Sequence, residues 1–255
     1  MNELKGIFEE YGAVVFFDTE TTGLDADTCQ IIELAAIRIE RNEDGTLRIA
    51  GSMDDFIKLP EGEKLPEKIV NLTGITDEQL EAEGVHEAKA AATFGDMIRN
   101  NKGPVLIVAY NAQFDLQFIK AMLQRDPFGI GDIFLAIADF LDGMTVYKDR
   151  RAYPHKLANA IKAYNLADRV HNSHRAIDDV EALFDVCRAM SKERDDLLDY
   201  VNVFGYNPKY GAAGPHIQGV TYWPQHSNDC MQAPDSTLPA RCKKKQTPKE
   251  EQQNA

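Results

Sequence analysis

Short apolar runs along the chain predict a set of buried β-strands. Residues 13–17 are five consecutive apolar residues whose β-branched and aromatic members favour a strand buried on both faces. Residues 30–40 are predicted as a second strand, and the turn signal at residues 42–45 leads into a third over residues 46–59. These three strands form an expected antiparallel meander. Residues 104–109 predict a further short strand.

Segments with helical patterns alternate with these strands. The Ala-rich residues 86–99 have strong helix propensity, and Thr76 with Gln79 three positions later has the form of a helix N-cap and its capping-box partner. Strands interleaved with helices indicate an α/β fold. Further helices are expected over residues 2–11, 113–125, 140–149, 156–165 and 176–192.

Two carboxylates follow the first apolar strand at alternate positions. Asp18 and Glu20 are separated by one residue, so a strand places both side chains on the same face. Two adjacent anions on a core strand are costly unless a proton or a cation neutralises them, and a divalent metal that prefers oxygen ligands does so most simply. The alternative is that the strand emerges into solvent and both acids are ordinary surface charges.

Two later segments carry further candidate residues. A predicted apolar strand is followed by Asn111 and then by Asp115, in the first turn of a predicted helix, where an acid also interacts favourably with the helix dipole. His174 precedes the last predicted helix, and Asp179 lies in its first turns. From a loop, His174 can reach the same point as Asp179, and histidine is the usual proton acceptor for a water nucleophile. The simpler alternatives are a capping role for Asp115 and a surface role for His174.

Composition limits the possible classes of protein. With 255 residues, 44% of them hydrophobic, the chain can bury one sizeable core. A net charge of −13 argues against binding to nucleic acid through a broad basic face, although metal ions on clustered carboxylates would reverse the charge locally. The four cysteines are dispersed, so neither a zinc site nor a disulfide framework is expected. No signal peptide and no membrane-spanning run are visible, which predicts a cytoplasmic protein without membrane contact.

Three stretches resemble the motifs of the DEDDh-type 3′–5′ exonucleases, the family of the proofreading epsilon subunit of bacterial DNA polymerase III. The first is D-T-E-T-T-G-L, with Asp18 and Glu20, and the second is Y-N-A-Q-F-D, with Asp115. The third is H-R-A-I-D-D, with His174 and Asp179 at the spacing of the h subclass. The resemblance covers about residues 13–192. It implies an RNase H-like α/β fold with a central mixed β-sheet flanked by helices.

The resemblance also implies a chemistry for these residues. His174 would take a proton from the attacking water, whereas His171 has no match in the motif and is interpreted as a loop residue. Two divalent ions, Mg²⁺ or Mn²⁺, would be held by four carboxylates: Asp18, Glu20, Asp115 and Asp179.

Residues near the first two motifs are expected to contact the terminal nucleotide. They are Thr21, Gly23, Leu24 and Asn111. The alternative for Gly23 and Leu24 is a tight turn with a core leucine. Tyr110 stands where many relatives carry histidine, so the contact to the nucleotide differs there.

The resemblance implies an exonuclease that releases nucleoside 5′-monophosphates from nucleic-acid 3′ ends. DNA, in proofreading or repair, is the expected substrate, and 3′-end trimming of RNA is the alternative. A catalytically lapsed adaptor of a polymerase assembly is a further alternative, which the retention of all four carboxylates and the histidine disfavours. Any proofreading is expected to occur in trans, with a DNA polymerase subunit as partner.

The chain is expected to divide into three parts. These are an exonuclease domain over residues 1–200, an aromatic C-terminal extension over residues 201–225 packed on that domain, and a disordered tail over residues 226–255. The rings of the extension are expected to be buried against the core. The alternative is that they stack on the bases of a single strand, which the scarcity of Lys and Arg among them disfavours.

Overall fold

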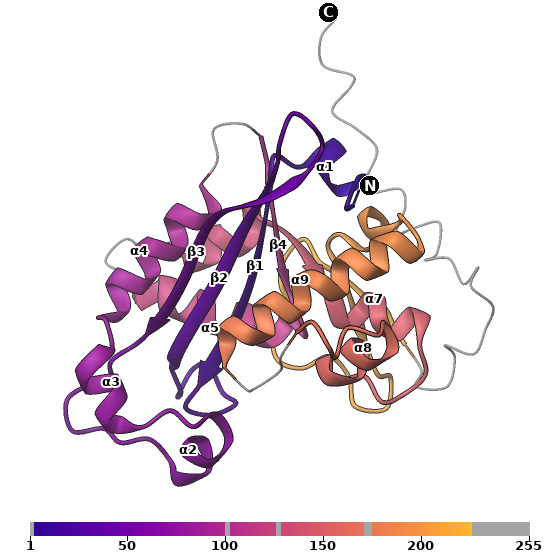
Figure 1. Cartoon of the computed structure of the whole chain (residues 1–255). Helices are drawn as coiled ribbons and strands as arrows, with labels where there is room; N and C mark the ends of the chain where they lie inside the picture. The colour runs from indigo at the N-terminus through magenta and orange to yellow at the C-terminus, as the bar shows by residue number, and fades with distance from the viewer. Residues whose placement is uncertain (1–2, 100–102, 126–128, 171–174, 226–255) are drawn as a thin grey trace, which may run out of the picture.

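A five-stranded mixed β-sheet forms the centre of the molecule. The computed structural model describes residues 3–99, 103–125, 129–170 and 175–225. The strand order is β3-β2-β1-β4-β5; β1 pairs antiparallel with β2 and parallel with β4. The predicted α/β architecture with a mixed sheet flanked by helices is therefore confirmed (Figure 1). The strands are β1 (Ala13–Thr21), β2 (Ile31–Arg41), β3 (Leu47–Phe56), β4 (Val105–Ala109) and β5 (Asp139–Asp142).

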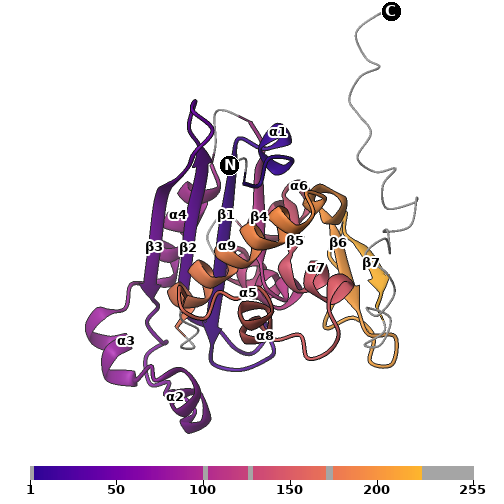
Figure 2. The same cartoon turned by 45° about the vertical axis from the view of Figure 1, so that its right-hand side comes forward.

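Helices cover both faces of this sheet. On one face, Val14 and Phe16 of β1 pack in a core shared with α7, α8 and α9. On the other face, Val15 and Phe17 pack in a second core shared with α4, α5 and α6. Because both faces of β1 are buried, its apolar run is continuous, as expected for a central strand (Figures 1 and 2). The helices are α1 (Ile7–Glu10), α4 (Glu87–Ile98), α5 (Ala112–Arg125), α6 (Gly131–Ile137), α7 (Gly143–Arg150), α8 (Leu157–Ala163) and α9 (Ala176–Glu193).

A small two-helix lobe follows β3. It contains α2 (Glu67–Thr73) and α3 (Asp77–Glu83) and has an apolar cluster of its own beside β2. The predicted capping box is confirmed: the Gln79 backbone N–H donates to the Thr76 hydroxyl, and the Thr76 N–H donates to the Gln79 side chain. The start of α3 is therefore determined by residues within one turn of it.

The helix predicted over residues 140–149 is wrong at its start. Residues 139–142 form β5, and Phe140 and Leu141 pair in parallel with Ile107 and Val108 of β4. The helix α7 begins only at Gly143. The Asp142 side chain caps it by accepting hydrogen bonds from backbone N–H groups of its first turn. A four-residue strand that runs directly into a helix leaves too short a pattern to be recognised in the sequence.

The segment after α9 packs beside α5 and α7. After the 3₁₀ helix η1 (Leu197–Tyr200), the strands β6 (Val203–Tyr206) and β7 (Thr221–Pro224) pair in parallel (Figure 2). Phe204 is buried, and the Tyr222 hydroxyl donates to the Gln113 side chain of α5. Tyr210, in contrast, is 75% exposed. Residues 226–255, predicted as a tail, lie outside the described residues.

None of the described helices is both long enough and apolar enough to cross a bilayer.

Candidate active site

Three carboxylates converge at the carboxyl end of the central strand. Asp18 and Glu20 leave the same face of β1, the face that α9 covers, and Asp179 arrives from the first turn of α9. Their nearest oxygen atoms all lie within 4.8 Å of one another. This arrangement can hold a metal ion, and its oxygen-only donors suit a hard divalent cation.

The fourth predicted carboxylate, Asp115, lies beside this group in the first turn of α5. It is buried, and one of its oxygens accepts a hydrogen bond of 2.7 Å from the Thr19 hydroxyl. Its charge raises the pKa of Asp18, so the two carboxylates repel each other. The sequence analysis did not identify Thr19. Its position between Asp18 and Glu20 on the strand places its side chain on the opposite face of β1, and this was the signal that could have found it.

Burial and repulsion raise the pKa values of Asp18, Glu20 and Asp115. Burial, followed by repulsion from the neighbouring carboxylates, raises the pKa of Asp18 well above its usual range. The same causes raise the pKa of Glu20 to about 8, and burial raises that of Asp115 to about 7 even though the Thr19 hydroxyl acts to lower it. A bound divalent cation would relieve the repulsion and displace protons from these acids.

A further buried acid, Glu33, holds the start of α9. It lies opposite Glu20 in the β1–β2 register and is fully buried. Its carboxylate accepts from the Arg175 guanidinium at 2.8 and 2.7 Å and from the Ala176 backbone N–H at 3.1 Å. Glu33 therefore fixes the first turn of the helix that carries Asp179. An acid inside the apolar run I-I-E-L-A-A was the signal that could have identified it.

Asp142 plays the corresponding role for the second motif. Asn111 has a left-handed backbone (φ 67°), and its N–H donates to Asp142 at 2.8 Å, as does the Ala112 N–H at 3.3 Å. The other Asp142 oxygen accepts from the Thr145 hydroxyl, which in turn accepts from the Gly205 N–H at 2.7 Å. Asp142 thus sets where α5 begins, and it was missed because the prediction placed it inside a helix.

The turn after β1 presents Leu24 to solvent. The Thr21 hydroxyl donates to the Gly23 carbonyl at 2.7 Å, and Leu24 is 86% exposed, so it is not the core leucine of the alternative interpretation. A Cβ added at Gly23 would lie 2.6 Å from the Cys29 sulfur. The position requires glycine because the Cys29 side chain packs against its backbone.

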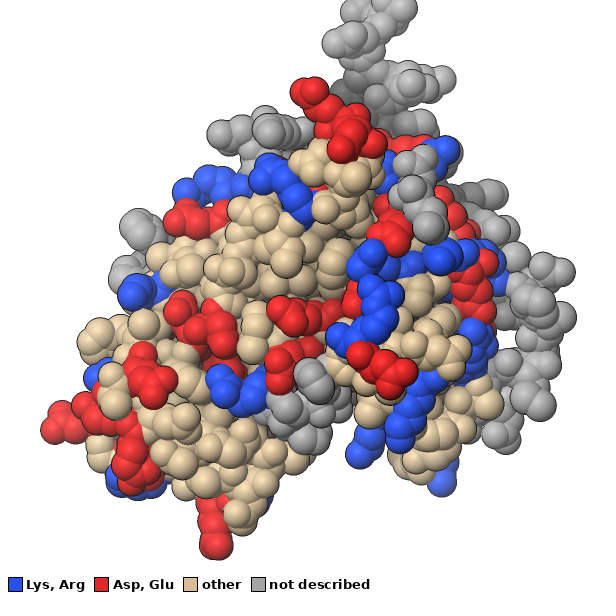
Figure 3. Space-filling view, in the orientation of Figure 1, with Lys and Arg blue, Asp and Glu red and all other residues tan. Residues whose placement is uncertain are grey.

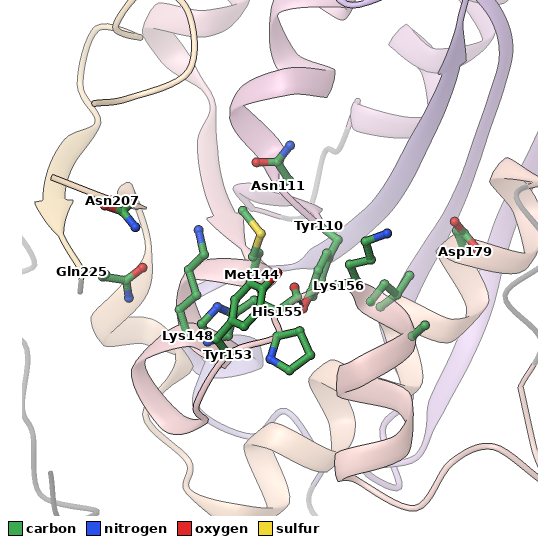
Figure 4. Close-up of a pocket in the computed structure, with 13 residues that line it drawn as sticks. Tyr110, Asn111, Met144, Lys148, Tyr153, His155, Lys156, Asp179, Asn207 and Gln225 are labelled. Carbon is green, nitrogen blue, oxygen red and sulfur yellow. Dashed lines mark hydrogen bonds between the residues drawn. The ribbon is translucent and has the colours of Figure 1, made fainter. Parts of the chain in front are cut away.

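The predicted base, His174, lies outside the described residues, as does His171. The described chain resumes at Arg175, directly before α9. Tyr110 is half-buried, and its hydroxyl donates to the His155 carbonyl at 2.8 Å. Asn111 and Asp179 both border a pocket beside the acidic cluster (Figure 4).

Comparison with known proteins agrees with this geometry. The structure superposes on Escherichia coli exonuclease I in complex with a dA16 oligonucleotide with a TM-score of 0.61, at 22% identity, covering 74% of this chain and 43% of that one. The fold is therefore the predicted RNase H-like one, with an acidic cluster at the end of its central strand. A model of the RNase T-type exonuclease family matches residues 15–187, so the chain belongs to this exonuclease family, as predicted.

Two curated relatives differ greatly in length: one is much longer than this chain and the other is of similar length. It is 32% identical over 206 residues to the PolC-type DNA polymerase III of Latilactobacillus sakei, which covers 79% of this chain and 13% of that protein. It is 29% identical over 206 residues to ribonuclease T of Photobacterium profundum, covering 75% of this chain and 87% of that protein. The chain thus spans about an eighth of the length of the polymerase relative.

Proposed function

We propose that this protein is a metal-dependent 3′–5′ exonuclease that releases nucleoside 5′-monophosphates. The observation that carries the proposal is the convergence of Asp18, Glu20 and Asp179 within 4.8 Å, with Asp115 close enough to raise the pKa of Asp18. These residues come from the three motifs in the order that the family requires. Clustered carboxylates whose burial and mutual repulsion raise their pKa values fit a metal-binding role better than a structural one.

The four carboxylates would hold two divalent ions, Mg²⁺ or Mn²⁺. Their oxygen donors, the closeness of Asp18, Glu20 and Asp179, and the repulsion between Asp115 and Asp18 support this proposal. When bound, such a pair lowers the pKa of water and stabilises the attacking and leaving oxygens of a phosphodiester. Glu33 and Thr19 keep two of the carboxylates in place through the start of α9 and through a direct hydrogen bond.

His174 is the proposed general base, on the evidence of the third motif. Its neutral imidazole would take a proton from the attacking water. The water oxygen bonds to phosphorus, the bond from phosphorus to the 3′ oxygen breaks, and that oxygen takes up a proton to become the new 3′ hydroxyl, which balances the proton that the water gives up. Thr21, Gly23, Leu24 and Asn111 are proposed to contact the terminal nucleotide.

DNA is the proposed substrate. The fold matches that of an exonuclease bound to a dA16 oligonucleotide, which supports DNA as the substrate. One relative is a DNA polymerase, which supports a polymerase subunit as the partner. The similarity to ribonuclease T over most of its length supports RNA 3′ ends as the second candidate.

The test offers 5′-labelled single-stranded DNA, a mismatched primer–template and RNA in parallel, with Mg²⁺ or with EDTA. We expect stepwise shortening from the 3′ end in Mg²⁺ only, fastest on DNA. The variant D18N/E20Q should be inactive, and D168N, which changes an exposed acid outside the site, should match the parent protein. Degradation that persists in EDTA or in the double variant would contradict the proposal, and no degradation by the parent protein would favour the lapsed adaptor.

A further inference from the structure

The C-terminal segment, residues 203–225, packs against the first turn of α5, the helix that carries Asp115. Gln113 lies in that turn, two residues before Asp115, and is only 7% exposed. Its side chain donates a hydrogen bond to the Pro215 carbonyl and accepts one from the Tyr222 hydroxyl. A buried amide costs free energy unless it is paired, and here both its nitrogen and its oxygen bond to the segment.

The segment is itself held in place where it meets α5. The Tyr222 hydroxyl also accepts a hydrogen bond of 2.9 Å from the Ile217 N–H, and the Tyr222 ring stacks on the His216 ring at 3.9 Å. Ile217 is buried in the core that α5 shares with the sheet. The Pro215 carbonyl accepts a second hydrogen bond, of 2.9 Å, from Gln117, one turn further along α5. This part of the segment is therefore a fixed support for the helix.

Hydrogen bonds hold the first turn of α5 from opposite sides. Two positions along a helix are about 200° apart, so Gln113 and Asp115 point in nearly opposite directions. Asp115 accepts from Thr19 of β1, whereas Gln113 bonds to the segment. Because hydrogen bonds are directional, these contacts fix the rotation of the turn about the helix axis. A rotation of about 10° would move a carboxylate that lies about 6 Å from the axis by about 1 Å, enough to disturb a catalytic geometry.

The composition of the segment favours a positioning role over direct contact with nucleic acid. Lys209 is its only charged residue, whereas Lys and Arg side chains gather over α7 and α8 (Figure 3). Phosphates are bound mainly by Lys and Arg, so the segment offers little to a nucleic-acid strand. The segment also lies outside residues 15–187, which the family model matches. Its hydrogen bonds reach α5 through Gln113 and α7 through Thr145, and both helices border the second motif.

We propose that the C-terminal segment positions the second motif, and that Gln113 and Tyr222 are the residues through which it holds Asp115 in place. The proposal rests on the proposed exonuclease function. Neither residue is proposed to touch the substrate or the metal ions; both act through the orientation of α5. Residues 203–225 thereby have a part in catalysis that the three motifs do not contain.

The test uses the full-length chain and the variant Y222F, which removes one hydroxyl and keeps the ring. With a single-stranded oligothymidylate, we expect kcat at saturating Mg²⁺ to fall about tenfold, KM for the oligonucleotide to stay within about twofold, and the Mg²⁺ concentration for half-maximal rate to rise about tenfold. Y210F removes a hydroxyl from a ring of the same segment that is 75% exposed. This matched control should equal the parent protein in all three quantities.

A metal-binding measurement gives a second readout that needs no substrate. The electron paramagnetic resonance signal of free Mn²⁺ reports how much of the ion is bound, and we expect Y222F to weaken Mn²⁺ binding about tenfold. Y210F should leave it unchanged. If Y222F does not fold, Q113M replaces it, because methionine fills the space of the glutamine side chain without its hydrogen bonds.

Three outcomes would count against these assignments. A lower Tm of Y222F with parental kcat and Mn²⁺ affinity would overturn the positioning role, because the segment would then only add stability. A higher KM with an unchanged kcat would also overturn it, since the segment would then bind the strand directly. A parent protein that binds Mn²⁺ but does not hydrolyse the oligonucleotide would instead overturn the exonuclease function, and the Mn²⁺ titration would still test the positioning of Asp115.

Discussion

Replacing Glu33 by glutamine removes the charge that fixes the first turn of α9. The variant keeps the size and shape of the side chain but loses the ion pair with Arg175 and weakens the acceptor for the Ala176 N–H. Since Asp179 lies one turn into the same helix, E33Q should move a proposed metal ligand without touching it. The expected result is loss of both stability and activity.

The magnitude follows from the interactions of this carboxylate. Removing one partner of a buried ion pair costs about 3–5 kcal/mol. The Arg175 side chain is 35% exposed, so water reaches the guanidinium and the loss is smaller. The charge of Glu33 also raises the pKa of Glu20, and relief of that repulsion offsets a further part. We expect the free energy of unfolding to fall by about 2 kcal/mol, which lowers Tm by about 4–8 °C in a domain of this size.

Thermal unfolding followed by circular dichroism measures the first effect, and single-turnover hydrolysis well below Tm measures the second. E43Q, which changes an exposed glutamate in the β2–β3 turn, is the matched control. The double variant E33Q/R175Q should cost less than the sum of the single variants, because the two residues interact. Additive costs, or an E33Q variant with parental Tm and activity, would refute the positioning role of Glu33.

Three shorter predictions concern the acids and the β1 turn. In EDTA, Glu20 and Asp115 have pKa values raised to about 8 and about 7, so they hold protons that the unfolded chain releases at lower pH. Tm should therefore fall as pH rises from about 5 to 8, and Mg²⁺ should restore it. A Tm that is independent of pH and of Mg²⁺ would contradict this prediction. T19V keeps the branched shape of the side chain but removes the hydrogen bond to Asp115, so kcat/KM should fall about tenfold. The control is T93V, which removes an exposed hydroxyl of α4 and should leave kcat/KM unchanged. G23A should lower the free energy of unfolding by about 1–3 kcal/mol, as measured by urea unfolding, and the second change C29A should restore most of it.

The sequence predicted the elements whose signals are local. The apolar run of β1, the alternation of Asp18 and Glu20, and the capping box at Thr76 each depend on neighbours within a few positions, and the structure has all three. The acidic residue Asp179 was placed correctly because it lies in the first turn of a long, strongly patterned helix.

The residues that hold the site together could not be predicted in this way. Glu33 meets Arg175 across 142 positions of sequence, and Asp142 meets Asn111 across 31. Neither pair forms a pattern along the chain, and only the packing of α9 and β5 against the sheet brings them together. The strand β5 was missed for the same reason, since its pairing with β4 is visible only in three dimensions.

The bonding of Thr145 has a practical consequence for anyone who shortens this protein. Its single hydroxyl donates to Asp142 and accepts from Gly205, and Asp142 in turn accepts from the Asn111 N–H, so three hydrogen bonds in series connect the C-terminal segment to the backbone of the second motif. Deleting the segment would leave that hydroxyl without its donor and loosen the start of α5. Low activity of a truncated protein would therefore reflect a disturbed second motif as readily as a direct role of the segment itself.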